Sequence, residues 1–451
     1  MLLRQSLSTL TIAMLLGGGA CLAQTATAPK QTLSLNQAIA IAQAHHPSMA
    51  VASASVSSAA AGLQQARAVS RPSITLAEDA TYSNDPIFAF GSKLRQGRFA
   101  QSDFSLDALN HPDALADFSG SATLHWTMFD AATKHNVAAT KATLQAAELN
   151  RRYTAEELAA RITALYYRAL TAEDQIAVAQ HALARAREVD ASVADRVHSG
   201  MALETDRARA DLTVRTAEDD LAQGNENVTL ARQDLFALMD VTPTTQTLLR
   251  DEDAPADASL STHGNLEQRL DMQALSAQTL AAQQTIYAAH SARYPKITTY
   301  GHAQNDALHV ITSGSGNWTI GARVELSIFD GGMRRAQEQA AAAQVATIEA
   351  QRRDALLEAN AQVRQLQAQI EDLRRRLATA VETIRVQQAT LSATRDRYTA
   401  GLASLSDVLQ AETDLTAAEF SRVRTSYQLR IASANLALAT GSSLISKAGR
   451  P

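Results

Sequence analysis

Apolar residues recur at every seventh position along the second half of the chain, the spacing of a helix that buries one face along its whole length. A second set of apolar residues follows the first at a displacement of three positions. The first set is Leu356, Val363, Ile370, Leu377, Ile384, Leu391 and Tyr398, and the second is Ala359, Leu366, Leu373 and Ala380. A seam of this kind predicts a long helix that lies against other helices in a coiled-coil-like array.

The same layout occurs earlier in the chain, which indicates that one unit is present twice. Gly200 and Gly401 are 401 − 200 = 201 residues apart, and the same offset relates Asp206 to Asp407. Subtracting this offset from the first set recovers a second seam, which is interrupted at Asp190. Its apolar residues are Ala155, Ile162, Ala169, Ile176, Leu183 and Val197. We therefore expect two copies of one helical layout.

The stretch from Asp130 to Gly200 is 200 − 130 = 70 residues long and contains no proline. As a helix it would extend about 105 Å at 1.5 Å per residue, whereas helices of globular proteins average roughly 11–12 residues. With the repeat continuing to Gly441, the chain is expected to build a long tube or rod.

Segments of alternating apolar and polar residues precede each long helix. Pro72 and Pro295 end helical stretches, because proline lacks the amide proton and clashes in a helix interior. In the second copy the apolar set is Trp318, Ile320, Ala322, Val324, Leu326 and Ile328, and in the first it is Ala122, Leu124, Trp126 and Met128. Arg323 and Glu325 belong to the opposite, polar set. This pattern predicts membrane-barrel strands with lipid on one side and a water-filled lumen, lined by Arg323 and Glu325, on the other.

The alternation alone equally fits a solvated sheet that covers a soluble core. The partner strands, near residues 74–82 and 297–304, alternate less regularly, and a loop of about 37 residues from Ser83 to Ser119 joins the first pair. Four strands do not close a membrane barrel, since the smallest kind has about eight. A membrane role therefore requires several chains, because an open sheet edge in lipid leaves backbone groups unpaired.

Each second strand leads into a long helix through the dipeptides Phe129-Asp130 and Phe329-Asp330. Aspartate is a favoured N-cap because its carboxylate accepts hydrogen bonds from the first free amides. Gly331-Gly332 follows the second aspartate, but no Gly-Lys-Ser/Thr comes after it, so we interpret this junction as a bend and not as a phosphate loop.

The N-terminus has the layout of a secretory signal, with Arg4, an apolar run and small residues. We predict a signal peptide over residues 1–23, a first repeat over 24–240, a periplasmic linker over 241–262, a second repeat over 263–441 and a tail over 442–451. Cys21 offers an alternative to cleavage after Ala23, namely lipid attachment at a mature N-terminal cysteine. As Cys21 is the only cysteine, the chain has no disulfide. No later apolar run is long enough for a transmembrane helix.

Three stretches resemble the TolC-type outer-membrane efflux proteins. They are LSLNQAIAIAQAHHP (33–47), RVHSGMALETD (196–206) and RYTAGLASLSDVLQAE (397–412), the last two similar to the family's hairpin tips. The resemblance covers nearly the whole mature chain. It implies a homotrimer in which three sets of four strands form one twelve-stranded outer-membrane barrel, surrounded by lipid and continued by a periplasmic α-helical barrel. The fold class is α+β and mainly α, with duplicated strand-strand-helix-helix units.

The resemblance also implies roles for residues at the tips. It assigns adaptor contacts to two turns, Ser199-Gly200-Met201 and Ala400-Gly401-Leu402, and the periplasmic aperture to Asp206, Tyr398 and Asp407. The residues alone leave simpler interpretations open: glycine is a common helix C-cap, and most helical carboxylates lie on a solvated face. Ala403 and Gln410 depart from the best-known member, which has arginine and aspartate there, so the links that close the pore are expected to differ.

Charge and motifs exclude other classes of function. The net charge of −5 and the pI near 6.1 do not favour nucleic-acid binding. His45 and His46 are adjacent and point about 100° apart on a helix, so they are interpreted as a helix end before Pro47 and not as a metal pair. No catalytic motif is present, and no cofactor or metal is expected.

The predicted function is passive export. The chain is expected to be a subunit of an outer-membrane exit duct that passes small molecules from the periplasm, or from an inner-membrane pump through a periplasmic adaptor. Two alternatives remain open, an exit duct for type I protein secretion and a non-conducting periplasmic coiled-coil scaffold or adaptor.

Overall fold

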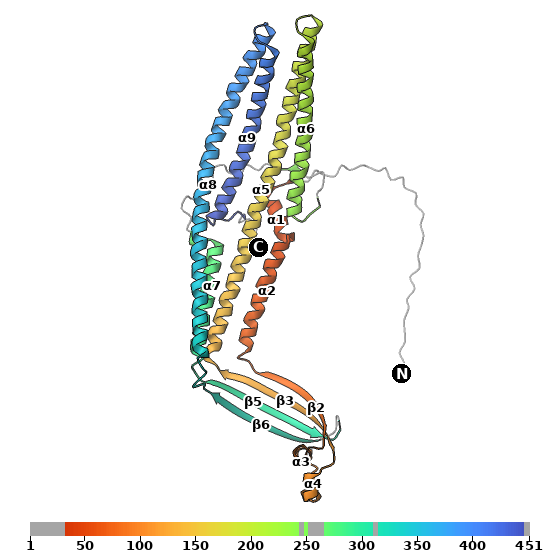
Figure 1. Ribbon diagram of the computed structural model, residues 1–451, viewed down its shortest axis with the longest axis vertical. Coiled ribbons are helices and arrows are strands. Elements are labelled where there is room, and N and C mark those ends of the chain that lie inside the picture. The colour runs from red at the N-terminus through yellow and green to blue at the C-terminus, as the bar shows by residue number, and fades with distance from the viewer. Residues whose placement is uncertain (1–31, 243–247, 251–265, 310–313, 446–451) are drawn as a thin grey trace, which may run out of the picture.

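The computed structural model describes residues 32–242, 248–250, 266–309 and 314–445. The molecule is elongated, with an antiparallel sheet at one end and the tips of two helical hairpins at the other (Figure 1). The predicted signal peptide with Cys21 and most of the predicted linker lie outside the described residues.

Two very long helices run from the sheet to the tips, as the seams predict. They are α5 (Ala131–His198), of 68 residues, and α8 (Met333–Thr399), of 67 residues. Each is about 100 Å long at 1.5 Å per residue. Each turns back into a shorter partner, α6 (Glu204–Leu238) or α9 (Leu405–Ala439), which packs along the half nearer the tip.

Shorter helices flank the half nearer the sheet. Helix α2 (Pro47–Ala68) packs against α5, and α7 (Leu270–Ser291) lies against both α5 and α8 (Figure 1). Helix α1 (Leu35–His45) precedes α2, and His46 separates them: its Nδ1 accepts the amide of Ser48 at 3.1 Å. The histidine pair therefore marks a helix junction, as predicted.

The sheet has the order β2-β3-β5-β6, with every pair antiparallel. The strands are β2 (Ser73–Ser83), β3 (Leu115–Phe129), β5 (Lys296–Ala307) and β6 (Ser315–Glu325). Each copy of the repeat thus contributes one hairpin, and β3 pairs with β5 across the two copies. The duplicated strand-strand-helix-helix unit is confirmed.

Three details of the strands differ from the sequence pattern. Strand β3 has 15 residues and not about ten, and β6 ends at Glu325 before the alternating run does. Strand β5 is regular although its alternation is weak, because it pairs with a strand on both sides. The segment between β2 and β3 contains helices α3 (Pro86–Arg95) and α4 (Leu106–Asn110), with a 3₁₀ turn, η1 (Gln101–Phe104), between them.

The two junctions between strand and helix also differ from each other. Asp130 is the N-cap of α5 and accepts the amide of Ala132 at 2.9 Å, as predicted. The N-cap of α8 is Gly332, whose φ of 93° suits glycine. Asp330 acts from two residues earlier and accepts the amides of Gly332 (3.1 Å) and Arg334 (3.2 Å). The extra glycines delay the start of the second helix.

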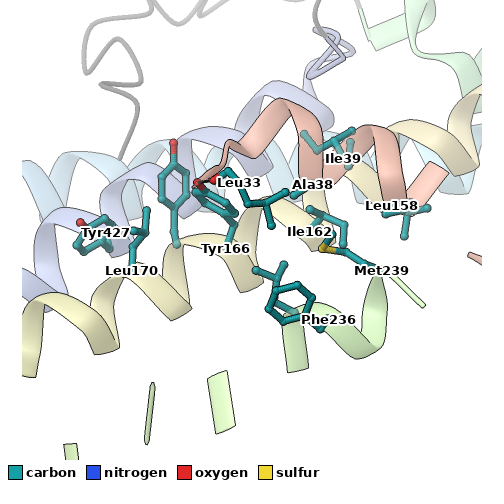
Figure 2. Close-up of a cluster of buried hydrophobic side chains, with 14 of the residues drawn as sticks. Leu33, Ala38, Ile39, Leu158, Ile162, Tyr166, Leu170, Phe236, Met239 and Tyr427 are labelled. Atoms are coloured by element: carbon teal, nitrogen blue, oxygen red, sulfur yellow. Dashed lines mark hydrogen bonds between the residues drawn. The ribbon is translucent and has the colours of Figure 1, made fainter. Parts of the chain in front are cut away.

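The main apolar core lies where α1 meets α5, the end of α6 and the middle of α9 (Figure 2). Tyr166 of α5 is fully buried there. Its hydroxyl lies 2.7 Å from the carbonyl oxygen of Leu33 and 2.8 Å from that of Arg250. Leu33 belongs to β1 (Thr32–Leu33), which pairs in parallel with β4 (Leu248–Leu249). Tyr166 therefore joins the start of the described chain to the segment that links the two copies.

Candidate functional site

The two hairpin tips are built in the same way. Helices α5 and α8 end in Schellman turns, in which Gly200 (φ 71°) and Gly401 (φ 74°) adopt the left-handed conformation. The amide of Met201 donates to the carbonyl of Arg196 at 2.7 Å, and the amide of Leu402 donates to the carbonyl of Arg397 at 2.7 Å. A side chain at either glycine would strain the turn. Sequence reasoning placed both turns correctly.

Each tip presents apolar side chains to solvent. Met201 and Leu203 on the first tip and Leu402 on the second are about two-thirds exposed, at 65%, 68% and 70%. Ser199 and Ala400 are exposed beside them. Neighbouring apolar groups at the end of a rod form a surface that another protein can bury.

The second tip contains a capping box that the first tip lacks. The Ser404 amide and hydroxyl donate to the Asp407 carboxylate at 2.9 and 2.8 Å, and the Asp407 amide donates back to the Ser404 hydroxyl at 3.2 Å. These bonds, helped by the nearby Arg397, hold the pKa of Asp407 below its ordinary value. The matching position in the first copy is Leu203, which has no capping group. Asp407 is thus fixed at the helix start, whereas Asp206 has no such partner in its own turn.

Tyr398 lies between the two hairpins, next to the charges of Arg196 and Asp206. The Arg196 guanidinium lies 4.7 Å from the centre of the Tyr398 ring, and its Nη1 donates to the Thr399 carbonyl at 3.3 Å. Burial raises the pKa of the Tyr398 hydroxyl; the positive charge of Arg196 opposes this shift, and the negative charge of Asp206 adds to it. The Tyr398 hydroxyl and Arg196 Nε are buried without a hydrogen-bond partner among the described residues. The structure therefore places one predicted aperture residue, Tyr398, against Arg196 of the other hairpin, and the charge of Asp206 acts on the same hydroxyl.

A second polar link joins the hairpins farther from the tip. The Glu412 carboxylate of α9 accepts Arg185 of α5 at 3.0 Å and also pairs with Arg395 of α8. Arg185 also pairs with Glu419 at 3.0 Å, and Arg395 with Glu188 at 3.4 Å. Sequence reasoning missed this cluster. One signal was available: Leu405, Glu412 and Glu419 are spaced by seven residues, so two acids lie on the same face of α9 as a buried leucine.

The sheet has one polar and one apolar face. Arg323 and Glu325 lie on the polar face at the end nearer the helices. Their register partners on the neighbouring strand β5 are Thr298 and Lys296, respectively. On the other face, Trp318 and Ile320 are 76% and 74% exposed. Further exposed apolar residues on that face are Ile74, Leu76, Tyr82 and Val324. Both edge strands, β2 and β6, have one side unpaired within the described chain.

In the part of the chain that the structure describes, no group of three or more His, Cys, Asp or Glu side chains is arranged to hold a metal ion. None of the described helices has both the length and the hydropathy to span a bilayer.

Comparison with known proteins gives a consistent result. A family model described as outer membrane efflux protein matches residues 38–240 and 263–442. A curated relative, the probable outer membrane lipoprotein SilC of Salmonella typhimurium, is 26% identical over 295 residues. That alignment covers 63% of this chain and 63% of the relative, slightly less than two thirds of each.

Solved structures share the fold over most of both chains. CusC superposes with a TM-score of 0.75 at 20% identity, covering 91% of this chain and 92% of that chain. VceC of Vibrio cholerae gives 0.71 at 22% identity, with 91% and 96% covered. The open-state MtrE outer membrane channel of Neisseria gonorrhoeae gives 0.72 at 19% identity, with 91% and 89% covered. Because the family model matches most of the sequence, the chain belongs to the outer membrane efflux protein family.

Proposed function

We propose that the chain is one of three identical subunits of an outer-membrane exit duct. The observation that carries the proposal is the four-stranded sheet, which has an exposed apolar face, a polar face and two unpaired edges. Such edges in lipid cost several kcal/mol per unsatisfied backbone group. Pairing β2 of one copy with β6 of the next removes them, and three copies give 3 × 4 = 12 strands. Arg323 and Glu325 then face the lumen, and Trp318 and Ile320 face lipid.

The helices continue this duct into the periplasm. The family places the chain in the outer membrane, and two helices of about 100 Å extend away from the sheet. The tips at Ser199-Gly200-Met201 and Ala400-Gly401-Leu402 would contact a periplasmic adaptor that connects the duct to an inner-membrane pump. Asp206, Tyr398 and Asp407 would surround the periplasmic aperture, where carboxylates from three chains favour cations over anions. The cargo we propose is small molecules.

The N-terminal alternative also belongs to this proposal. The relative SilC is named as a probable outer membrane lipoprotein, which supports lipid attachment at Cys21. A lipid there would anchor the helical part beside the barrel. Mass spectrometry of the mature protein distinguishes the two outcomes, because lipidation leaves Cys21 as the first residue and adds acyl chains.

Conductance tests the proposal directly. Purified protein inserted into planar bilayers should give discrete channels. The protein should also require detergent for its extraction from cell membranes, and it should migrate in gel electrophoresis as a heat-modifiable oligomer. A non-conducting scaffold would instead wash off membranes with urea or salt. Protein that is extracted without detergent, or that never conducts at any voltage, would contradict the exit duct.

A further inference from the structure

The segment between β2 and β3 forms a compact unit at the end of the sheet farthest from the helices (Figure 1). Phe99 contacts both Phe90 and Phe104 edge to face, with ring centres 4.9 and 5.0 Å apart. Lys93 of α3 pairs with Asp103 of the 3₁₀ turn at 2.9 Å. The segment therefore has internal packing of its own and is held as one body.

This unit is attached to the polar face of the sheet. Ser119, Gln304 and Asn317 face the same side, because Gln304 is the register partner of both Asn317 and Ser121, and Ser119 lies two residues from Ser121 along β3. Gln304 confirms this orientation by donating to Ser119 Oγ at 2.8 Å. Asp117 and Asp306 lie two residues along β3 and β5 on that same face, which is also the face of Arg323 and Glu325.

Two buried carboxylates anchor helix α3 there. Asp306 is 0% exposed and Asp117 is 4% exposed. Asp117 accepts Ser92 Oγ at 2.9 Å and Gln96 Nε2 at 2.8 Å. The Arg95 guanidinium lies 3.3 Å from Asp306 and 3.6 Å from Asp117, so one cation serves both carboxylates.

Burial of the Asp117 and Asp306 carboxylates is energetically costly unless the Arg95 guanidinium stays beside them. Two carboxylates removed from water need countercharge and hydrogen bonds, and loss of the partner leaves an uncompensated buried charge. Gln304 and Asn317 complete the shell around Asp306 at 2.7 and 3.3 Å, but both are neutral. Arg95 is thus the side chain that makes this docking of α3 stable.

We infer that the α3–α4 segment is a built-in constriction over the outer mouth of the duct, and that Arg95 is the positioning residue that holds it against the lumen face. The inference rests on the proposed exit duct, because the polar face becomes the lumen only when the sheets close into a barrel. Three helices, each about 10 Å across, would then lie over one opening. Release of the segment widens the mouth without changing the periplasmic tips.

The first test removes the contacts of Arg95 with Asp117 and Asp306. During openings of the periplasmic aperture, when the outer mouth is the narrowest point of the duct, Arg95→Ala should raise single-channel conductance roughly twofold or more, because pore conductance depends on the narrowest constriction. Arg95→Lys should restore most of the wild-type value. Arg98→Ala is the matched control: it removes the same charge three residues away, and Arg98 bonds to Gln96 and not to either carboxylate. Equal conductance of Arg95→Ala and the wild type would overturn the inference.

The second test replaces the contacts of Arg95 with a disulfide bond between the segment and the sheet. A Cβ at Gly97 would lie 3.5 Å from Ser315 Cβ, at the short end of the range for disulfides. In the triple variant Arg95→Ala, Gly97→Cys, Ser315→Cys, oxidation should return the conductance to the wild-type value, and dithiothreitol should raise it again. A purely structural role for Arg95 would give no reversible response to reductant.

A deletion covers the case in which the left-handed Gly97 (φ 67°) does not tolerate cysteine. Ser83 and Leu115 are paired directly in register, so residues 84–114 can be replaced by an Asn-Gly turn that closes the hairpin. The deletion should conduct at least as well as Arg95→Ala. If the wild type forms pores and neither Arg95→Ala nor the deletion has a higher conductance, the constriction is refuted and the exit duct is not. If the wild type forms no pores at all, the exit duct is refuted.

Discussion

Arg196→Ala should make the proposed aperture open more readily, because Arg196 bridges the two hairpins at the tip. Its guanidinium lies over the Tyr398 ring at 4.7 Å and donates to the Thr399 carbonyl at 3.3 Å, whereas Arg196 itself belongs to the other hairpin. Both contacts must break if the hairpins separate. The alanine variant loses them in the closed state and loses nothing in the open state.

The magnitude follows from these two contacts. A cation–π contact at a partly exposed site contributes about 0.5–1 kcal/mol, and a hydrogen bond to a neutral carbonyl contributes about 0.5–1.5 kcal/mol. The sum is about 1–2.5 kcal/mol per subunit, which is a factor of roughly 5–70 in the ratio of closed to open subunits. Arg196→Lys keeps the charge but loses the planar stacking, so it should fall between the wild type and the alanine variant.

The assay is single-channel recording in planar bilayers, with open probability as the readout. Arg187→Ala is the matched control, since Arg187 is also on α5 but pairs with Glu218 of the same hairpin at 2.7 Å, with both side chains exposed. Arg187→Ala should behave like the wild type. If Arg196→Ala shows the open probability of Arg187→Ala, the bridge at Tyr398 does not hold the aperture closed.

Three further predictions concern stability. Tyr166→Phe should lower the melting temperature followed by circular dichroism, because it removes a buried hydroxyl that bonds to the Arg250 carbonyl and to the Leu33 carbonyl, although the latter keeps the Arg250 amide; the cost is about 0.5–1.5 kcal/mol. Glu412→Gln should destabilise the protein by about 2–4 kcal/mol, because it leaves two partly buried arginines without their shared carboxylate. The control Glu382→Gln, which affects an exposed ion pair, should change the stability little. Equal melting temperatures of the Glu412→Gln and Glu382→Gln variants would contradict this. The depressed pKa of Asp407 contributes stability that is present above its unfolded pKa and is lost as pH falls through the folded pKa. The hydrogen-exchange protection factors of amides in the first turn of α9, which correct for the pH dependence of intrinsic exchange, should therefore fall on acidification, and Ser404→Ala should already have lower protection factors at neutral pH.

The long helices, their turns and the existence of the strands could be predicted from the sequence because each depends on local pattern. The seven-residue spacing that ends at Tyr398 becomes the seam of α8, where Leu366, Ile370 and Leu391 are buried. Gly200 and Gly401 end their helices because each turn needs a positive φ. Strand ends were less accurate, since pairing with a neighbour and not alternation decides where β3 and β6 stop.

The polar links between distant segments could not be predicted in this way. Arg196 and Thr399 are separated by 203 positions, and Arg185 and Glu412 by 227. No local pattern indicates which charged residue on one helix will meet which on another. The docking of Arg95 on Asp306 has the same origin, because it depends on which face of the sheet the intervening helix returns to.

Cross-linking of the sheet edges tests the central claim most directly. Strands β2 and β6 are separated within one chain by two others, about 14 Å at the spacing of paired strands, so cysteines on them cannot form a disulfide inside one subunit. Ala77→Cys on β2, combined in turn with cysteine at Asn317, Thr319 or Arg323 on β6, should give covalent dimers and trimers, and no larger species, in at least one register. Monomers alone in every combination, or ladders that extend beyond three subunits, would contradict a closed barrel built from three copies of this chain.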